Sequence, residues 1–157
     1  LKINFMSNWL YNDDGSKIAI AEDFSTDEYG FIYKITNLET GKYYIGKKAF
    51  FHNKKKKLTK KEIAEQTGPG RKATTRVDQV DSGWKSYWGS SKELLADVKK
   101  LGDDKFERLI LKFAKTKKQL TYYELESQIL HNALFDSTSY NDNILGKFFK
   151  KDFVTTE

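Results

Sequence analysis

The residues best suited to acid–base chemistry are two tyrosines and a lysine within residues 29–48. This segment reads YGFIYKITNLETGKYYIGKK. Tyr33 and Tyr44 each lie in a short apolar and aromatic run, and Lys47 follows Tyr44 by three residues. A phenol, whose pKa is about 10, is a poor base at neutral pH unless a nearby cation stabilises its anion. Lys47 would supply that charge, with Lys48 as the second candidate. The alternative is that both rings only pack a hydrophobic core, as strand tyrosines often do.

A β-hairpin is the element that would place the two tyrosines beside each other. The runs at residues 29–36 and 42–46 flank the polar segment 37–41, which ends in Gly41. A five-residue connection with a glycine near its end is typical of a hairpin with a bulge or a short loop. The sequence therefore predicts two paired strands with one tyrosine on each.

Basic charge is concentrated in the segment that follows this hairpin. Residues 47–76 contain eleven Lys or Arg and two acidic residues, whereas the whole chain has a formal net charge of +6. Such a concentration is typical of a protein that binds a polyanion, although a solvated loop with no partner has the same composition. The residues expected to contact nucleic acid are Lys48, Lys54, Lys55, Lys56, Lys57, Lys60, Lys61 and Lys72.

The composition excludes several other kinds of site. The 157 residues contain no cysteine and two histidines, His52 and His131, so disulfides, thiolate metal sites and multi-histidine zinc sites are excluded. No run approaches the roughly 18 apolar residues of a membrane span, and no signal-peptide pattern opens the chain. We expect a cytoplasmic protein with no membrane segment and with Met6 as its natural start.

The strand pattern predicts a small α+β domain with short connections. Residues 9–22 are expected to form an N-terminal hairpin, and the apolar run at 106–113 is expected to be a buried strand. Residues 71–81 have no clear period and are rich in Thr, Lys and Arg, so a mobile basic segment is expected there.

Three helices complete the predicted domain. Thr59 with Glu62 and Ser90 with Glu93 form capping boxes, which start one helix over residues 59–66 and another that ends before Gly102. The third helix is expected to start near Thr116 or Thr121. Its predicted core face consists of Leu120, Tyr123, Ile129, Leu130 and Leu134.

Two short segments resemble the motifs that give the GIY-YIG nuclease family its name: Tyr29-Gly30-Phe31-Ile32-Tyr33 and Tyr44-Ile45-Gly46. The first contains one extra residue, Phe31, and the second is intact. Further landmarks follow in the family's order: Gly89-Ser90-Ser91-Lys92, then Tyr123-Glu124-Leu125-Glu126, then Tyr140-Asn141. The likeness covers about residues 29–145 and is strongest to small phage proteins with a lysine-rich insert after YIGKK. It implies a three-stranded antiparallel sheet flanked by about three helices.

The resemblance also implies cleavage of DNA phosphodiesters with a divalent metal, Mg²⁺ or a similar ion such as Mn²⁺. The metal-holding carboxylate would lie on the third helix, where Glu124 and Glu126 are the candidates. Two residues apart on a helix, they project about 200° from each other and cannot share one site. Glu124 is favoured and Glu126 is the alternative. Asn141 would support the site, or cap a helix or turn instead.

The chain departs from the family pattern at two basic residues, an arginine and a histidine. The family's arginine follows YIG closely, whereas the earliest arginine here is Arg71, so Arg71 or Arg76 would have to reach back across the insert to the scissile phosphate. Several family members carry a histidine near the position of Gly89, and His52 is a possible substitute. The resemblance assigns Tyr44 with Lys47 to the water and Tyr33 to the lining of the site.

These patterns lead to one hypothesis and one alternative. The hypothesis is a metal-dependent DNA endonuclease of phage or mobile-element (homing) type, active as a monomer or homodimer and without a small-molecule cofactor. The alternative is a nucleic-acid-binding module that keeps the fold but has lost catalysis. The expected division is an N-terminal extension at 1–28, a nuclease domain at 29–145 with the basic insert 49–83, and a tail at 146–157.

Overall fold

The computed structural model describes residues 8–154, and Met6 lies outside this range. The predicted hairpin at residues 29–48 is its centre. Strand β3 (Gly30–Asn37) pairs antiparallel with β4 (Tyr43–Ala49), and Tyr33 lies opposite Gly46. The turn closes because the Asn37 side-chain oxygen accepts hydrogen bonds from the Glu39 and Thr40 amides and Gly41 adopts a φ of +76°.

The sheet is larger than predicted. Strand β7 (Phe106–Ala114) pairs antiparallel with β3, which gives the three expected strands. The N-terminal hairpin, β1 (Trp9–Asp13) and β2 (Ser16–Ala19), then extends the same sheet, with β1 parallel to β7. The result is a mixed five-stranded sheet in the order β2-β1-β7-β3-β4 rather than a three-stranded antiparallel one, although the α+β class is confirmed. Trp9 explains the addition, since its ring is buried and its indole N–H donates to the backbone oxygen of Trp84.

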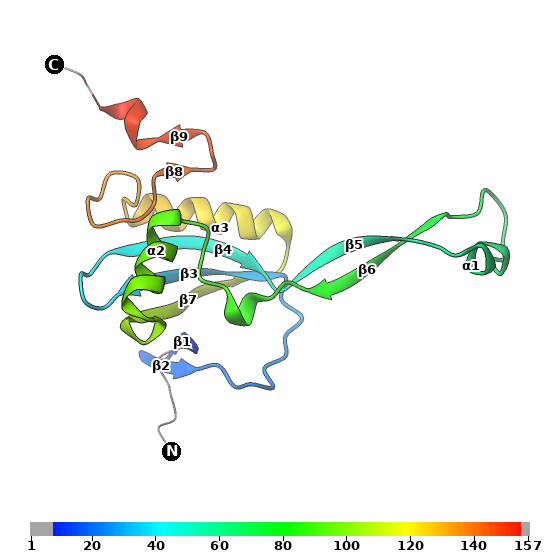
Figure 1. Cartoon of the computed structure of the whole chain (residues 1–157), viewed down its shortest axis with the longest axis horizontal. Coiled ribbons are helices and arrows are strands. Elements are labelled where there is room, and N and C mark those ends of the chain that lie inside the picture. The colour runs from blue at the N-terminus through cyan, green and yellow to red at the C-terminus, as the bar shows by residue number, and fades with distance from the viewer. Residues whose placement is uncertain (1–7, 155–157) are drawn as a thin grey trace.

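Two helices cover opposite faces of this sheet (Figure 1). Helix α2 (Lys92–Leu101) packs Leu94 against the face that carries Phe31 and Tyr33, and α3 (Lys117–Leu130) packs Leu120 against the other face. Because both faces are covered, β3 is buried along most of its length. Within residues 8–154, no named strand pairs with the edge of β4 away from β3, and an isolated bridge joins Tyr43 at this edge to Ser139.

The helix boundaries differ in detail from the prediction. Thr116 caps α3 as expected, but Ser91 rather than Ser90 caps α2, accepting a hydrogen bond from the Leu94 amide. The expected core positions Ile129 and Leu130 are 59% and 78% exposed. Gln128, directly before them, is buried and bonded to β4, so Ile129 and Leu130 lie on the side of α3 that faces away from the sheet.

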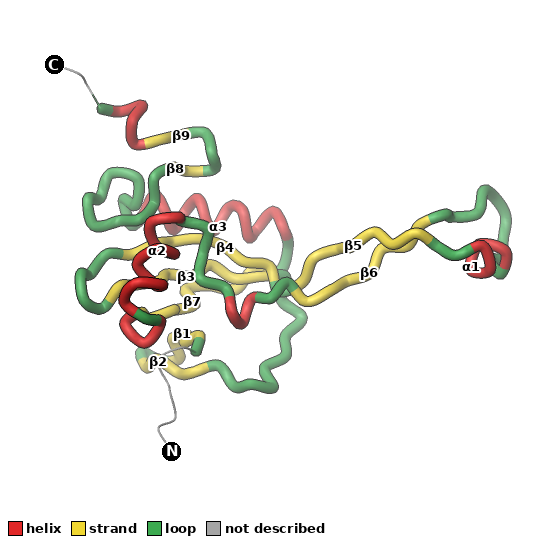
Figure 2. Tube along the Cα trace, viewed as in Figure 1, coloured by secondary structure: helices red, strands yellow, loops and turns green. Residues whose placement is uncertain are grey.

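The basic insert forms an arm that projects from the domain (Figures 1 and 2). Strands β5 (Phe51–Lys57) and β6 (Thr75–Asp81) pair antiparallel, and the short helix α1 (Lys60–Ala64) lies at the tip. The capping box of Thr59 and Glu62 is confirmed by both of its hydrogen bonds. Residues 75–81 form a strand where a mobile segment was expected, because their backbone groups pair with β5 although their side chains have no apolar pattern.

The remaining elements are short. Three 3₁₀ turns (Trp84–Ser86, Asp103–Lys105 and Lys150–Phe153) and a small hairpin of β8 (Asn143–Ile144) and β9 (Phe148–Phe149) complete the described chain. None of the helices within residues 8–154 is long and apolar enough to cross a membrane.

Candidate active site

A cavity of about 760 Å³ lies beside the free edge of β4 and contains most of the expected site residues. Strand β4 contributes Tyr44 and Lys47, and helix α3 contributes Glu124. The N-terminal end of α2 and the segment after α3 close the other sides, through Ser90, Lys92 and Asn141. The structure thus brings together side chains that are up to 97 positions apart in the sequence.

Glu124 and Lys47 form the charged centre of this cavity. The Lys47 Nζ lies 3.4 Å from Glu124 Oε1 and donates a 3.3 Å hydrogen bond to Thr121 Oγ1. Burial raises the pKa of Glu124, and the Lys47 ammonium partly offsets this effect. A carboxylate that has lost water and has a single lysine as its charge partner is one that a further cation would stabilise.

Glu126, the other candidate carboxylate, lies outside the cavity. Its Oε1 lies 3.9 Å from Lys112 on β7, and its side chain is 38% exposed, against 15% for Glu124. Glu126 does not line the cavity, as the opposite projection of the two residues on α3 requires.

Tyr44 directs its hydroxyl to the N-terminal end of α2, where it shares a 2.9 Å hydrogen bond with Ser90 Oγ. Burial raises the pKa of Tyr44, while the hydrogen bond to Ser90 acts in the opposite direction. Its phenol is therefore protonated at neutral pH in the protein alone. Sequence reasoning assigned Ser90 to the helix cap and missed this contact. Because Ser91 caps the helix, Ser90 is left to bind the tyrosine.

Tyr33 lies beneath the cavity rather than in it. Its side chain is 1% exposed, its ring centroid is 6.1 Å from that of Tyr44, and burial raises its pKa well above 10. A Cβ atom at Gly46 would lie 2.5 Å from the Tyr33 hydroxyl and 2.8 Å from the Tyr44 ring. The glycine of the second motif thus lets both tyrosines pack over the β4 backbone.

Asn141 and Gln128 hold the edge of β4 in place. The Ile45 amide donates to Asn141 Oδ1 at 3.0 Å, and the Ile45 carbonyl oxygen accepts from Asn141 Nδ2 at 2.8 Å and from Gln128 Nε2 at 3.0 Å. These side chains satisfy backbone groups that a neighbouring strand would otherwise pair. Sequence reasoning anticipated a supporting role for Asn141, but its partner, the central residue of the YIG motif, needed the three-dimensional structure.

The two arginines expected at the scissile phosphate lie on the arm. Arg76 pairs with Glu62 at 3.3 Å and with Asp78 at 3.2 Å, and Arg71 is exposed near the tip. Neither residue lines the cavity, nor does His52. The cations that do so are Lys47 and Lys92, the second of which sequence reasoning did not assign to the site.

A third arginine, Arg108, is 4% exposed and serves the fold. Its guanidinium stacks between the rings of Trp9 and Trp88 and donates to the backbone oxygens of Lys85 and Tyr87. Burial lowers the pKa of Arg108 to about 10. The side chain fastens the segment before α2 to the sheet, and so fixes the side of the cavity on which Ser90 lies.

The donor set of the cavity fits a hydrated hard cation better than a closed metal cage. Across residues 8–154 there is no cluster of three or more His, Cys, Asp or Glu residues that could hold a metal. Mg²⁺ needs fewer, since it keeps several waters and binds one or two carboxylates together with substrate phosphates. Glu124 is such a carboxylate, and the neighbouring Gln128 Oε1 is a buried oxygen that has no hydrogen-bond partner.

The tyrosine-bearing β3–β4 hairpin, whose outer strand is at the sheet edge, and one glutamate of α3 converge on one cavity of an α+β domain. Residues 9–145 match the family model described as "Putative endonuclease segE, GIY-YIG domain". The chain therefore belongs to the GIY-YIG endonuclease family.

One curated relative is "Putative endonuclease segE" of Enterobacteria phage T4, which is 31% identical over 112 residues. The matched region is 71% of this chain and 39% of that protein, so the chain spans about two-fifths of the relative's length. No solved structure matches the chain.

Proposed function

We propose that the protein is a metal-dependent DNA endonuclease of phage or mobile-element type, which hydrolyses phosphodiester bonds in the β4-edge cavity. The observation that carries the proposal is the convergence of Glu124, Lys47 and Tyr44 in one open cavity. Membership of the GIY-YIG family supports the same chemistry. Hydrolysis of a phosphodiester needs an oriented water and stabilisation of charge on the phosphoryl oxygens.

Glu124 is the residue that would hold the divalent ion, either Mg²⁺ or Mn²⁺. Its carboxylate is half-buried and its charge is only partly offset by Lys47, so it is suited to a cation that keeps most of its waters. When bound, such an ion supplies positive charge at the phosphoryl oxygens and lowers the pKa of a bound water. Gln128, one helical turn away on α3, would orient the waters around Glu124.

Tyr44 and Lys47 would act on the attacking water. The Ser90 hydrogen bond fixes the Tyr44 hydroxyl at the mouth of the cavity, and the Lys47 ammonium lies on the Glu124 side of the same space. Burial raises the pKa of Tyr44, so its hydroxyl is protonated at neutral pH, and only the phenolate that remains after this proton has passed to solvent could take a proton from the attacking water. Nearby positive charge favours that ionisation. Tyr33 and Asn141 keep the strand and the tyrosine in position.

The α2 end of the cavity is where we place the DNA phosphate. Lys92 is the first residue of the ten-residue helix α2 and lines the cavity with Ser90. A lysine next to the N-terminal backbone amides of a helix attracts an anion. The prediction that Arg71 or Arg76 grips the scissile phosphate requires the arm to fold over the cavity. In the arrangement described, these arginines would contact phosphates far from the cleaved bond.

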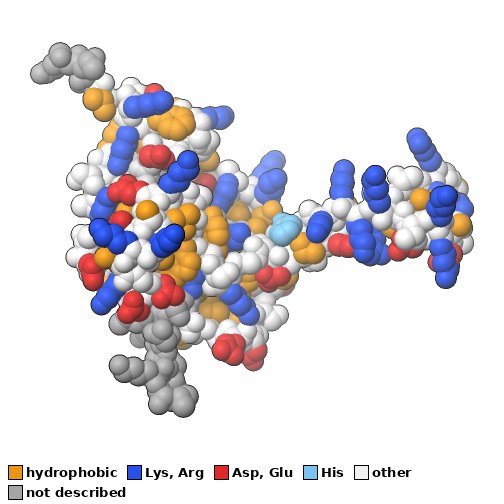
Figure 3. Space-filling model, viewed as in Figure 1, with side chains coloured by type: hydrophobic (Ala, Val, Ile, Leu, Met, Phe, Trp, Pro, Cys, Tyr) orange, Lys and Arg blue, Asp and Glu red, His pale blue; other side chains and the backbone are white. Residues whose placement is uncertain are grey.

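The arm and the neighbouring lysines would bind the DNA backbone. Lys48 lies over the ring of Tyr87 at the edge of the domain, 4.2 Å from the ring centroid. The Lys and Arg side chains of the arm continue from there to its tip (Figure 3). These contacts predict binding that weakens steeply with salt, because each neutralised phosphate releases condensed counterions.

Incubation with supercoiled plasmid tests the proposal. The protein is expected to convert supercoiled DNA to open-circular or linear DNA with Mg²⁺ or Mn²⁺ and to leave it intact with EDTA. Single-strand nicks would indicate a monomer that acts once, and linear product without accumulated nicks would indicate a dimer. Binding without metal-dependent cleavage on several DNA substrates would favour the alternative, an inactive nucleic-acid-binding module.

A further inference from the structure

The two faces of the arm carry different side chains, and this difference becomes visible only when the strands are paired. In an antiparallel ribbon, directly opposed residues share a face and successive residues alternate between faces. The register of β5 and β6 therefore defines an open face and a paired face. The open face carries Asn53, Lys55, Lys57, Thr75, Val77 and Gln79, and the paired face carries Lys54, Lys56, Arg76 and Asp78.

The paired face has part of its charge neutralised by its own acids. Arg76 is in contact with Glu62 of α1 and with Asp78 of the same strand, and Lys54 lies directly opposite Asp78. The open face has no acidic side chain over the rungs from Asn53 to Lys57. Its charge consists of the two lysines, and its other side chains are two amides, a threonine and Val77, which is 56% exposed.

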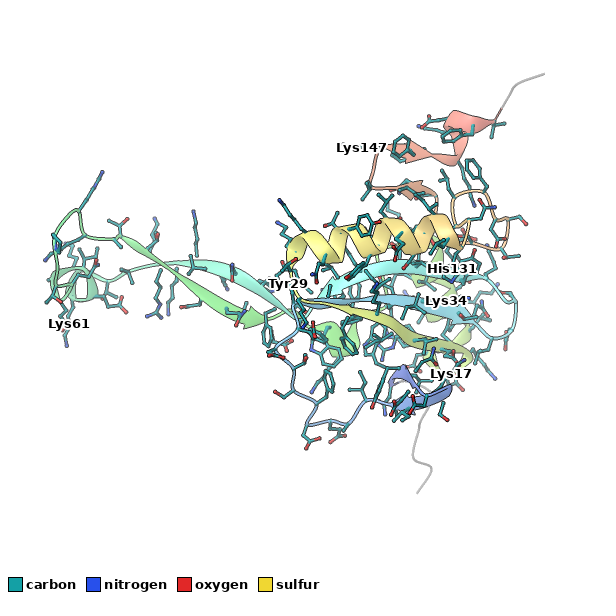
Figure 4. The ribbon with its side chains drawn as sticks, turned by 180° about the vertical axis from the view of Figure 1, so that it is seen from behind. Lys17, Tyr29, Lys34, Lys61, His131 and Lys147 are labelled. Atoms are coloured by element: carbon teal, nitrogen blue, oxygen red, sulfur yellow. The ribbon has the colours of Figure 1, made fainter. Side chains whose placement is uncertain are left out.

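The shape of the arm fits a groove of duplex DNA. A two-stranded β-ribbon is one of the elements that the major groove, about 12 Å wide, admits. The seven-residue strands extend about 23 Å from the domain. Figure 4 places Tyr29 at the root of the arm and Lys61 at its tip, with no other element alongside. The ribbon is therefore free to enter a groove along most of its length.

The side chains of the open face match the edges of A·T base pairs. Asn and Gln make paired hydrogen bonds to adenine N6 and N7, and an exposed aliphatic group contacts the thymine methyl. Asn53 lies opposite Gln79, and the next rung on the same face holds Lys55 and Val77. Consecutive rungs on one face are about 6.7 Å apart, close to twice the 3.4 Å spacing of bases along a strand.

The root of the arm has two acidic side chains and one lysine beside the amides, a small acidic excess that bears on the orientation of the DNA. Asn53 and Gln79 also line a cavity of about 500 Å³ with Asp27, Glu28 and Lys115 of the domain. The acids repel phosphates from the root, whereas Lys55 and Lys57 attract them farther out. The sugar-phosphate strands would therefore lie toward the lysines, and base edges would face the amides.

We propose that the open face of the β5–β6 arm reads A·T base pairs in the major groove through Asn53, Gln79 and Val77. The proposal rests on DNA being the substrate, and it adds the element that gives the nuclease its sequence preference. The domain cavity supplies the chemistry, and the arm chooses where along the duplex that chemistry takes place.

Selection from a random-sequence duplex library in EDTA tests this without any cleavage. The protein is expected to enrich A·T pairs at positions about two base pairs apart, with a preference of about 5- to 150-fold for each amide contact. The double substitution Asn53→Ala and Gln79→Ala should remove the preference, and Val77→Ala should reduce it. The matched control on the paired face, Lys54→Ala, should weaken binding to all sequences alike and keep the preference.

A second library with 7-deazaadenine identifies the groove. This base lacks the N7 acceptor of the major-groove edge, so the preference should fall toward that of the double variant. The proposal is overturned if the protein enriches no sequence, if the double variant enriches the same one, or if 7-deazaadenine changes nothing. Since the selection contains no metal, loss of nuclease activity in the plasmid assay would leave this result unaffected, and the two proposals fail separately.

Discussion

The β3–β4 hairpin and the β5–β6 hairpin have the same antiparallel topology but opposite surroundings. Nearly every residue of β3 is buried between α2 and α3, whereas every residue of β5 is exposed. The first hairpin holds Tyr33 against Tyr44 with Gly46 between them, so its positions are fixed by packing. The second is held mainly by its backbone ladder and by the tip, where Gln66 makes two hydrogen bonds to Ala73.

This difference suits the two hairpins to different roles: the packed hairpin to the positioning of catalytic groups, and the exposed hairpin to the binding of DNA. A catalytic group must be held within a fraction of an ångström, which close packing provides. A DNA-binding arm gains from exposed charge and from freedom to adjust to the duplex, and needs little core of its own. The following predictions test this division, from the largest expected effect to the smallest.

Among changes in the two hairpins, substitution of Tyr44 by Phe should have the largest effect. It removes the hydroxyl that Ser90 orients while leaving the ring packed on Gly46, so cleavage should fall by about 10²- to 10⁴-fold, the usual contribution of proton-transfer groups. Single-turnover cleavage of plasmid DNA measures the loss. The control is Tyr43→Phe, since Tyr43 directs its hydroxyl to Asp136 and His131 outside the cavity. A Tyr44→Phe protein that cuts at the wild-type rate would refute the assigned role.

Replacement of residues 52–80 by a two-residue turn should have the next largest effect. Phe51 and Asp81 are paired, so a short turn can connect them without disturbing the buried Phe50. DNA affinity should fall by about 100-fold near 0.1 M salt, with a shallower salt dependence, because the arm's phosphate contacts are lost. The melting temperature should change little, because β5 buries no residue. A large fall in melting temperature would show that the arm supports the domain.

Asn141→Ala should destabilise the fold as well as the site. It leaves the buried Ile45 amide unpaired and removes one of the two hydrogen bonds to the Ile45 carbonyl, at a cost of about 2 kcal/mol. Urea unfolding measures this change in the free energy of unfolding. Asn143→Ala is the control, because the Asn143 side chain donates to Asp142 and accepts from the Gly146 amide within the β8–β9 region and, within residues 8–154, makes no hydrogen bond to β4. An equal loss in both variants would contradict the bracing role.

The pH dependence of cleavage should be the smallest of these effects when it is expressed per pH unit. Burial raises the pKa of Tyr44 above its ordinary value of 10, so the reactive phenolate is scarce at neutral pH. If Tyr44 takes the proton, its ionised fraction and the rate of the chemical step should rise about tenfold per pH unit between pH 7 and 9, without a plateau. Rates at saturating metal measure this slope. A flat profile would leave Tyr44 as a residue that only positions water.

The sequence predicted the elements whose local residue pattern is enough to specify them. The tyrosines, Gly46 and the turn at residues 37–41 identify the β3–β4 hairpin, and the Thr59 capping box identifies α1. The β6 strand could not be predicted, because its pairing with β5 uses backbone groups and its two apolar side chains, Val77 and Val80, give no core-facing pattern: Val77 is exposed and Val80 is only partly buried. The addition of β1 and β2 to the sheet also depends on long-range contacts, such as that of Trp9 with Trp84.

The candidate site shows the same limit. Helical geometry alone places Glu124 and Glu126 on different sides of α3, but only the position of β4 shows which of them meets Lys47. The shift of the α2 cap from Ser90 to Ser91 is a change of one residue, and it turns a presumed structural serine into a partner of Tyr44.

The comparison of Glu124→Gln with Glu126→Gln tests the central claim, that the β4-edge cavity is the active site, most directly. Both changes remove one negative charge from the same helix at nearly equal volume. Plasmid nicking in Mg²⁺ should fall by about 1,000-fold or more in Glu124→Gln, which loses the carboxylate proposed to hold the metal, and should stay within about twofold in Glu126→Gln. Wild-type nicking by Glu124→Gln, or an equal loss in Glu126→Gln, would contradict the account.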